Sequence, residues 1–293
     1  GNVLIVTPAD KVKTYGDLFA AFTGTVVGVQ PGDGITATYV SAGSAANAIV
    51  GTYDITVIIN DPLNRLPNYS NVILNVGTLT VNPRALVVTP DNKAKVFGTL
   101  FTTFTGTVTG VQAGDNITAA YASTGAPAIM PVGSYPITAT LNDPLNRLSN
   151  YTVTLNTGTL TVGLTILTVT ADDQTKVYGD ADPLFTFAYA GFTPGDTPAV
   201  LTTQPTCQVL PSHNAIGTYP ITCSGGIDEN YSFSYVAGTL TVTARPLTVT
   251  PDAKTKIYGD VFTAFTGNVT GLQASDNITV TYSSTGAPAI ATV

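Results

Sequence analysis

The side chains able to do acid–base, redox or metal chemistry are few in this sequence, and three of them lie in one stretch. The chain of 293 residues has two cysteines, Cys207 and Cys223, one histidine, His213, and one glutamate, Glu229. The cysteines could close a disulfide or, together with His213, offer three ligands to a metal ion. A structural metal site of this kind needs a fourth ligand, which the stretch lacks. A metal site is therefore disfavoured.

A catalytic role for His213 or Glu229 finds no support in their surroundings. A nucleophilic triad needs a base, and His213 is the only imidazole, in a Pro-Ser-His-Asn loop. A glycosidase needs two acids placed across a cleft, and Glu229 has only its neighbour Asp228. We expect His213 to be a solvent-exposed loop residue, and the protein to be no enzyme and to bind no cofactor.

Repeated aspartates are the remaining candidates for a metal site. Asp61 and Asp143 lie in identical Asn-Asp-Pro-Leu-Asn-Arg-Leu segments, and carboxylates in such loops can bind calcium. However, the sequence has no Asp-x-Asp-x-Asp run, and Asp before Pro or Gly is ordinary turn chemistry. We expect turn and capping roles, with calcium at Asp61 and Asp143 as the weaker alternative. Further aspartates mark a second recurrent turn: Asp33, Asp115, Asp196 and Asp276.

The composition of the chain indicates a folded β protein. Only 11 residues are basic against 18 acidic, a net charge of −7, whereas a nucleic-acid binder needs clustered Lys and Arg. With 44% apolar residues the chain is not of the disordered class, and no apolar run reaches the roughly 18 residues of a membrane helix. Frequent Thr and Val, punctuated by Gly and Pro, favour an all-β fold.

Internal repetition organises the chain into units of about 80 residues. Each unit contains a Tyr-Gly-Asp turn, replaced in the second unit by Phe-Gly-Thr, and the first three units close with Asn-Tyr and then Gly-Thr-Leu-Thr-Val. The turn residues, for which we expect a structural role, are Tyr15, Gly16, Asp17, Phe97, Gly98, Tyr178, Gly179, Asp180, Tyr258, Gly259 and Asp260. These markers predict three complete β domains, 1–83, 84–164 and 165–244, and an incomplete fourth, 245–293.

The units follow one another through joints of only a few residues, two of which contain proline. Short joints limit how far neighbouring domains swing, so we expect an elongated, semi-rigid rod. The fourth unit lacks the residues for its closing strands, which would leave an open sheet edge. It could be a fragment, a part of a longer chain, or a unit completed by a strand from a neighbouring molecule.

Within a unit the pattern predicts five to seven short strands. The opening segment alternates, as at Leu4 and Val6, which is typical of a half-buried strand. A Lys-x-Lys pair follows in most units, and its period of two places both ammonium groups on one solvated face. The recurrent lysine before the turn is also a candidate for an intramolecular Lys–Asn isopeptide bond. These lysines are Lys13, Lys95, Lys176 and Lys256.

Six markers that recur in order resemble the MBG repeats of YGX type, which occur in tandem in large bacterial surface and adhesin-like proteins. They are Leu-Thr-Val-Thr, Lys-x-Tyr-Gly-Asp, Gly-Phe-x-x-Gly-Asp, Gly-Thr-Tyr-Pro-Ile, Asn-Tyr and Gly-Thr-Leu-Thr-Val. The resemblance covers the whole chain and implies secretion, cell-surface display and a β-grasp-like module, while the strand pattern also fits an Ig-like sandwich. Phe97-Gly98-Thr99 departs from the pattern, which puts a role for a Tyr hydroxyl or an Asp carboxylate in doubt there.

In a secreted chain the even cysteine pair predicts a disulfide between Cys207 and Cys223, and such a loop closure is worth about 3 kcal/mol. Near-identical repeats with short joints predict a structural stalk or fibre segment of an extracellular, cell-surface adhesin-like protein. Its partners would be neighbouring repeats, other copies in a fibre, or surface glycans or proteins. Two alternatives stay open: a ligand-binding adhesion module for a glycan or host protein, and a strand-exchanged filament subunit.

Overall fold

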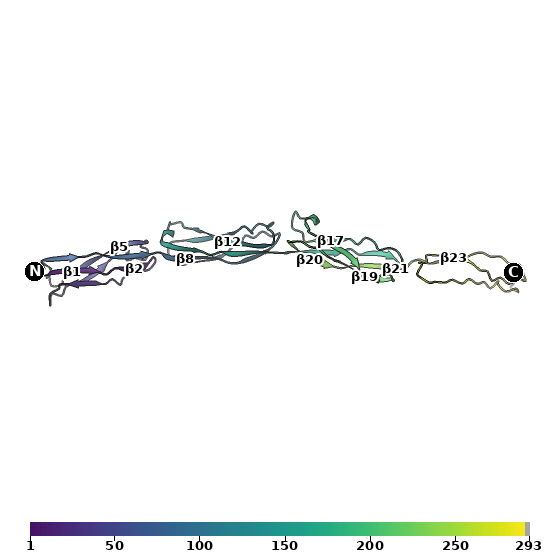
Figure 1. Ribbon diagram of the computed structural model, residues 1–293, viewed down its shortest axis with the longest axis horizontal. Coiled ribbons are helices and arrows are strands. Elements are labelled where there is room, and N and C mark those ends of the chain that lie inside the picture. The colour runs from purple at the N-terminus through teal and green to yellow at the C-terminus, as the bar shows by residue number, and fades with distance from the viewer. Residues whose placement is uncertain (291–293) are drawn as a thin grey trace. The chain divides into compact units, whose positions relative to one another are not determined.

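The computed structural model describes residues 1–290, which form short β-strands and single 3-10 turns (Figure 1). The chain divides into two compact units, Gly1–Gly163 and the part from Leu164 on. The first unit contains the first two repeats, and the second contains the third repeat and the fourth. The expected all-β class is confirmed.

Each of the first three repeats has seven strands in two sheets. The strands of the first are β1 (Val3–Pro8), β2 (Lys11–Thr14), β3 (Gly24–Val27), β4 (Thr36–Val40), β5 (Gly51–Asn60), β6 (Asn71–Leu74) and β7 (Gly77–Asn82). One sheet has the order β3-β1-β6 and the other β2-β7-β5-β4. The pairs β1–β6 and β2–β7 are parallel, whereas the other pairs are antiparallel.

The second and third repeats have the same two sheets. The strands of the second are β8 (Arg84–Pro90), β9 (Lys93–Val96), β10 (Gly106–Thr109), β11 (Thr118–Ser123), β12 (Gly133–Asn142), β13 (Tyr151–Leu155) and β14 (Gly158–Gly163). Those of the third are β15 (Thr165–Ala171), β16 (Gln174–Val177), β17 (Phe187–Ala190), β18 (Thr206–Val209), β19 (Gly217–Ser224), β20 (Tyr231–Val236) and β21 (Gly238–Thr243). In the fourth repeat β22 (Thr248–Pro251) pairs with β23 (Gly267–Thr270).

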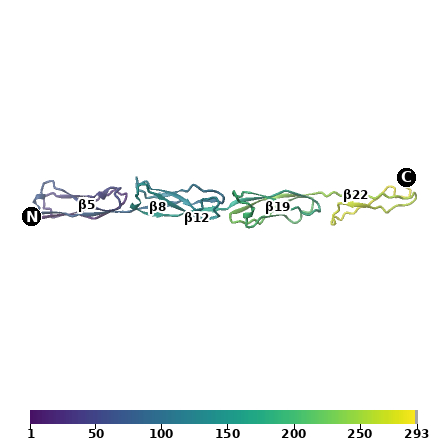
Figure 2. The same cartoon turned by 90° about the horizontal axis from the view of Figure 1, so that it is seen from above.

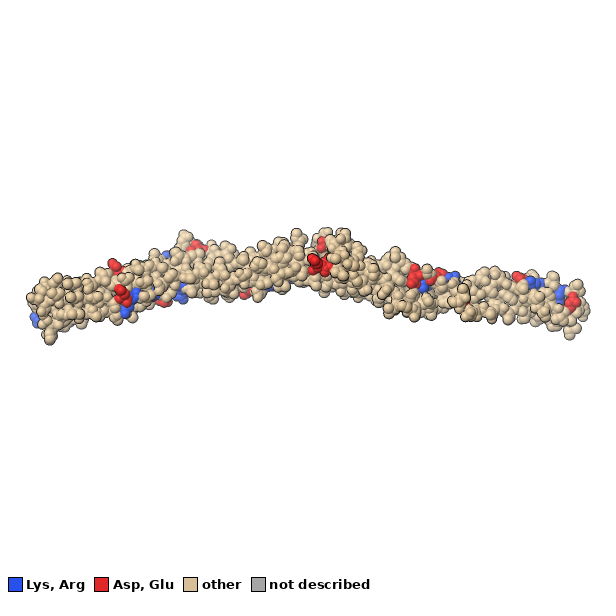
Figure 3. All heavy atoms as spheres, viewed as in Figure 1, with Lys and Arg blue, Asp and Glu red and all other residues tan. Residues whose placement is uncertain are grey.

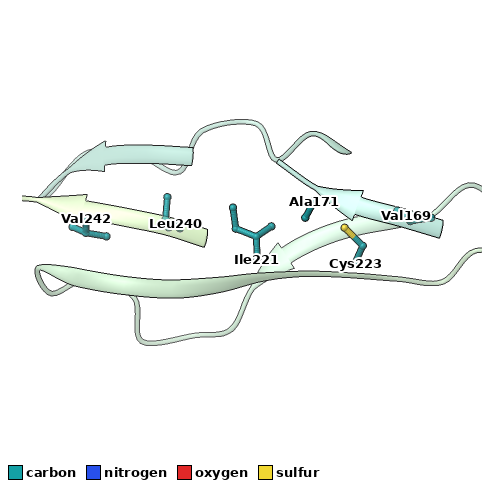
Figure 4. Packing of buried hydrophobic residues seen from close by; sticks show 6 residues of the cluster. All are labelled: Val169, Ala171, Ile221, Cys223, Leu240 and Val242. Carbon is teal, nitrogen blue, oxygen red and sulfur yellow. The ribbon is translucent and has the colours of Figure 1, made fainter. Parts of the chain in front are cut away.

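The two sheets of a repeat pack face to face as a sandwich. In the third repeat the buried cluster joins the three-stranded sheet to the four-stranded sheet (Figure 4): Val169, Ala171, Ile221, Cys223, Leu240 and Val242. A β-grasp module would need a helix across its sheet, and within residues 1–290 the helices are the single 3-10 turns η1 (Ala42–Ser44), η2 (Leu66–Asn68), η3 (Leu148–Asn150) and η4 (Pro198–Val200). The sandwich is therefore the alternative that the repeats adopt.

The chain enters and leaves each complete repeat at opposite ends. The first segment of the repeat and the last run side by side in the same direction, first in the three-stranded sheet and then in the four-stranded sheet. The strands consequently lie lengthwise within a repeat, as the top view shows for β8 and β12 (Figure 2).

In the first two repeats the second lysine of the Lys-x-Lys pair is buried, which corrects the expectation of a solvated pair there, whereas Lys256 of the fourth repeat is half-buried. Lys13 and Lys95 are 5% and 9% exposed. The Lys95 ammonium group donates to the main-chain oxygens of Thr99 at 2.9 Å and Ala126 at 3.3 Å, and also to that of Pro127. Burial lowers the pKa of both lysines. The partners of these two ammonium groups are main-chain oxygens and include no Asn side chain, so these contacts do not support a Lys–Asn isopeptide bond. In the first repeat they hold the loop after β4 against the turn, and in the second repeat they hold the loop after β11.

Candidate functional site: the joints between repeats

The Tyr-Gly-Asp turn of the first repeat lies directly against the second repeat. Tyr15 follows β2 and is 1% exposed. Gly16 has a φ of 93°, a conformation that strains other residues. A Cβ atom at Gly16 would also lie 2.4 Å from Gln112 Oε1 of the second repeat. The backbone conformation therefore requires the glycine, and a larger residue would also displace the Gln112 side chain of the neighbouring repeat.

Asp115 of the second repeat accepts hydrogen bonds from two tyrosines. Tyr15 Oη donates to the carboxylate and lies 3.0 Å from each oxygen, and Tyr151 Oη donates to the same carboxylate. The two rings meet edge to face with centroids 5.5 Å apart, a favourable aromatic geometry. Asp115 is buried, so these donors replace the water that its carboxylate loses.

Burial and the Asp115 carboxylate raise the pKa values of both tyrosines. For Tyr151 burial is the larger cause, and the pKa rises to about 12. The pKa of Tyr15 is raised by the same two causes, burial first. Both hydroxyl groups therefore stay protonated, as hydrogen-bond donors must, well into alkaline pH.

Arg84, the first residue of β8, holds the turn from the other side. Its Nε donates to Gly110 O at 3.0 Å and its Nη1 to Tyr15 O at 3.4 Å. Nη1 also lies 3.6 Å from Asp17 Oδ1. The Asp17 side chain is largely exposed, and an exposed ion pair contributes little. The arginine acts chiefly through its hydrogen bonds to the main chain.

A continuous apolar cluster underlies these polar contacts. Its buried members come from both repeats: Tyr15, Val81, Leu86, Ile117 and Tyr151. Beside it Val50 N donates to Asn150 Oδ1 at 2.9 Å. The joint is therefore a packed interface.

The second unit contains the same contact between the third and fourth repeats. Tyr178 Oη donates to Asp276 Oδ1 at 2.6 Å, and Arg245 Nε donates to Tyr178 O at 2.8 Å. Arg245 also pairs with Asp180. The hydrogen bond between Tyr178 and Asp276 raises the pKa of Tyr178 and lowers the pKa of Asp276. Gly179, with a φ of 82°, lies against Gln273 as Gly16 lies against Gln112.

The remaining turn residues adopt the same local conformation. Phe97 is 8% exposed and its amide donates to Gly163 O at 2.9 Å; its phenyl ring has no hydroxyl group to donate. Gly98 and Gly259 have φ values of 84° and 97°. Tyr258 of the fourth repeat is 69% exposed.

Sequence reasoning missed the partner of these turns. It assigned the aspartates of the second recurrent turn to capping, whereas each accepts a hydrogen bond from a tyrosine. Within a repeat the donor is the tyrosine of the Asn-Tyr marker, as in Tyr69 to Asp33 at 2.7 Å and Tyr231 to Asp196 at 2.6 Å. The aspartate and the tyrosine are 36, 36 and 35 residues apart in the three complete repeats, and this nearly constant spacing was a signal of the contact.

The predicted disulfide between Cys207 and Cys223 is confirmed. The two residues face each other across the antiparallel strands β18 and β19, and β18 is an edge strand of its sheet. The bond therefore fastens an edge strand to its neighbour inside one repeat.

His213 is not the solvent-exposed loop residue that we expected. Its side chain is 15% exposed, and Nε2 lies 2.8 Å from Asp182 Oδ2 while Nδ1 lies 2.9 Å from Leu210 O. Asp182 also accepts from Lys176 Nζ at 2.7 Å, and these partners, Lys176 first, lower its pKa. The expectation failed because Asp182 lies 31 residues away in sequence and is brought close only by the fold.

The calcium candidates use their carboxylates within their own loops. Asp61 accepts from the amides of Arg65 and Leu66 at 2.9 and 2.8 Å, and Asp143 makes the same two bonds. These amide donors lower the pKa of both aspartates. Within residues 1–290 no group of three or more His, Cys, Asp or Glu side chains is placed to hold a metal ion.

The same part of the chain contains no helix long and apolar enough to cross a membrane. Similar solved structures include Drosophila N-cadherin EC1-4, with 10% identity, a TM-score of 0.30 and coverage of 82% of this chain and 76% of that one. The titin I9-I11 tandem has 15% identity, a TM-score of 0.24 and coverage of 82% and 99%. TM-scores this low support no functional inference. No curated protein sequence matches the chain.

A family profile described as MBG domain (YGX type) matches the sequence four times, at residues 4–80, 86–161, 167–241 and 247–292. Two of the matches contain the Tyr-Gly pairs that lie at the joints, Tyr15-Gly16 and Tyr178-Gly179. The four matches span nearly the whole sequence, and the chain therefore belongs to the MBG domain (YGX type) family.

Proposed function

We propose that the chain is part of an extracellular spacer, a stalk or fibre segment that holds another part of a cell-surface protein at a distance. One observation carries the proposal: within each of the two compact units a recurring set of contacts fixes one repeat to the next by burial and hydrogen bonding. In the first unit these contacts use Tyr15, Arg84, Asp115 and Tyr151. A tether for independently acting modules would have no need of a buried joint.

The disulfide supports the extracellular part of the proposal. Structural disulfides form and persist in oxidising compartments and are rare where thiols are kept reduced. The nearest partners would be neighbouring repeats of the same chain. Charged side chains are sparse on the face shown in Figure 3, which leaves little basis for electrostatic steering of a charged ligand.

The joint can be tested by measuring the distance distribution between spin labels in the first two repeats. Labels at D54C and T138C lie on exposed positions on either side of the joint. We expect a narrow distribution in the parent chain and a broader one in Tyr15→Phe, which loses only the hydroxyl group. Tyr53→Phe, whose hydroxyl bonds within its own repeat, is the matched control and should leave the distribution narrow.

Two results would overturn the spacer proposal. One is an equally broad distribution in the parent chain, since an unconstrained joint cannot hold anything at a fixed distance. The other is tight, saturable binding of a single repeat in a glycan-array screen, which would make each repeat a ligand-binding module.

A further inference from the structure

The opening and closing segments of each complete repeat lie side by side along its length. In the second repeat five residue pairs join β8 to β13, from Arg84–Tyr151 to Val88–Leu155. Four further pairs join β9 to β14, from Lys93–Leu160 to Val96–Gly163. Both ladders are parallel, so both segments run from the entrance of the repeat to its exit.

The two segments change sheets together and are tied to each other where they do so. Asn92, between β8 and β9, accepts through Oδ1 from Thr159 N of the closing segment at 2.8 Å. Gly158 allows this approach, because a Cβ atom there would lie 3.0 Å from Pro90 O. The equivalent bonds of the other repeats are Asp10 to Thr78 N at 2.8 Å and Asp173 to Thr239 N at 2.7 Å.

Further hydrogen bonds extend the pairing beyond the ladders. Asn156 N donates to Val88 O, and its side-chain amide donates to Thr89 Oγ1 at 2.8 Å. At the exit Phe97 N donates to Gly163 O at 2.9 Å. Pairing therefore continues from the first residue of the repeat to its last.

This arrangement decides how a repeat meets tension along the chain. Force enters the second repeat at Arg84 and leaves it at Gly163, and these residues lie at opposite ends of the two parallel segments. Pulling makes the segments slide past each other, so the ladder bonds are loaded together. Antiparallel terminal strands pulled from one end would instead open one bond at a time.

We propose that the paired opening and closing segments of each complete repeat are a shear clamp that resists mechanical unfolding. The clamp has four pairs in each of its two ladders in the first repeat. In the third repeat it has six and four. The third repeat should therefore hold to the highest force and the first should yield earliest, because rupture under force follows the unfolding barrier.

The disulfide lies outside the clamp, on the edge strand β18 and its neighbour β19. It cannot carry the load while the clamp is intact, and it only shortens the length of chain released afterwards. The loop that it closes spans 16 residues, which is about 55 Å of extended chain. The released length consequently identifies the third repeat.

The inference deepens the proposed spacer function, and the two can fail separately. A spacer that bears no load would need stiff joints but not strong repeats. Conversely, strong repeats could stand in a chain whose joints are loose.

Single-molecule force spectroscopy on the whole chain, held by its termini, tests the clamp. A complete repeat should release up to about 270 Å, and the oxidised third repeat should release less and rupture last. Reduction should lengthen the third step by about 55 Å without lowering its force. Low forces for all repeats, or a third-repeat force that collapses on reduction, would overturn the proposal.

Substitutions in the second repeat locate the load. Asn92→Ala removes the tie between the segments and should lower the rupture force of one step, whereas Asn92→Asp, which copies the first and third repeats, should keep it. Asp143→Ala removes the two hydrogen bonds that its carboxylate accepts from main-chain N–H groups in a turn outside the clamp, and it should lower thermal stability without lowering the rupture force. An unchanged force in Asn92→Ala, or an equal loss in Asp143→Ala, would contradict the clamp.

Discussion

The second and third repeats fill one place between their sheets in different ways. In the second repeat Gly106 pairs with Pro90, and the ring of Tyr121 lies over the glycine, where a Cβ atom would approach the ring to within 2.6 Å. Tyr121 in turn faces Ala139 across β11 and β12. A large residue on β11 is therefore accommodated by two small neighbours.

In the third repeat the sizes are exchanged. Phe187 stands where Gly106 stands and pairs with Ala171, and Cys207 and Cys223 replace Tyr121 and Ala139. Phe187 and Cys207 both pack against the buried cluster of that repeat. The aromatic ring between the sheets is now that of Phe187, on β17 of the three-stranded sheet. The disulfide cysteine Cys207 lies on β18, at the position that Tyr121 has on β11.

The buried lysine differs between the same two repeats. Lys95 is held by three main-chain carbonyls, whereas Lys176 pairs with the Asp182 carboxylate, which also contacts His213. Asp182 replaces Phe101 at the corresponding position of the turn. In the core the exchange involves both sides of a contact, whereas at the lysine only the partner changes, from main-chain carbonyls to the Asp182 carboxylate.

The largest expected effect comes from introducing the phenylalanine of the third repeat into the second repeat without removing Tyr121. Gly106→Phe places a ring against Tyr121 and Thr89 O, so we expect the second repeat to lose more than about 3 kcal/mol, beyond the usual cost of overpacking. Hydrogen exchange, resolved by repeat, measures the loss. The double variant G106F/Y121C should recover part of it, and a double variant as unstable as G106F would show that the two positions are independent.

Removing the disulfide should have the next largest effect. Cys207→Ala with Cys223→Ala frees a loop of 16 residues, and the chain-entropy estimate is a loss of about 3 kcal/mol. The loss should be confined to the third repeat, as seen in hydrogen exchange, with the second repeat as the internal control. A much smaller loss would show that packing by Phe187 already holds β18 in place and that the disulfide adds little stability to the third repeat.

Much of this organisation could be predicted from the sequence. The markers around Tyr15 and Gly77 recur about every 80 residues, which gives the tandem array. The composition gives the β class, and the six ordered markers give the resemblance to the family. The disulfide followed from an even pair of cysteines in one unit. These features are local or periodic, so a single chain displays them.

The contacts at the joint could not be predicted in the same way. Tyr15 and Asp115 are 100 residues apart, and the pairing of one repeat's turn with the next repeat's aspartate has no local pattern. Burial of Lys95 was also missed, because an alternating Lys-x-Lys pair is usually solvated. Its partners are main-chain carbonyl oxygens, which every residue has, so no residue type in the sequence indicates them.

The two lysines should respond differently to removal of charge. Lys95→Met leaves buried carbonyls without a donor, and we expect a loss of about 1–3 kcal/mol in the second repeat. Lys176→Met leaves Asp182 partly exposed and still beside His213, so the loss in the third repeat should be below about 1 kcal/mol. Thermal unfolding followed by hydrogen exchange distinguishes them. Equal losses would show that the carboxylate and the carbonyls hold the ammonium group equally well.

The smallest expected effect is a difference in pH dependence. The pKa of Asp182 is lowered, chiefly by the hydrogen bond from Lys176 and then by His213. The ionised carboxylate therefore stabilises the third repeat above its ordinary pKa of 3.8, and this stabilisation is lost as the pH falls below that value. The pKa of Lys95 is lowered by burial, so the second repeat should instead gain stability as the pH rises towards 10.5. Hydrogen exchange across both ranges measures the two slopes. Asp182→Asn should remove the acid-side loss of the third repeat, below about 1 kcal/mol, and leave the second repeat unchanged; a loss that persists in Asp182→Asn would assign it to another carboxylate.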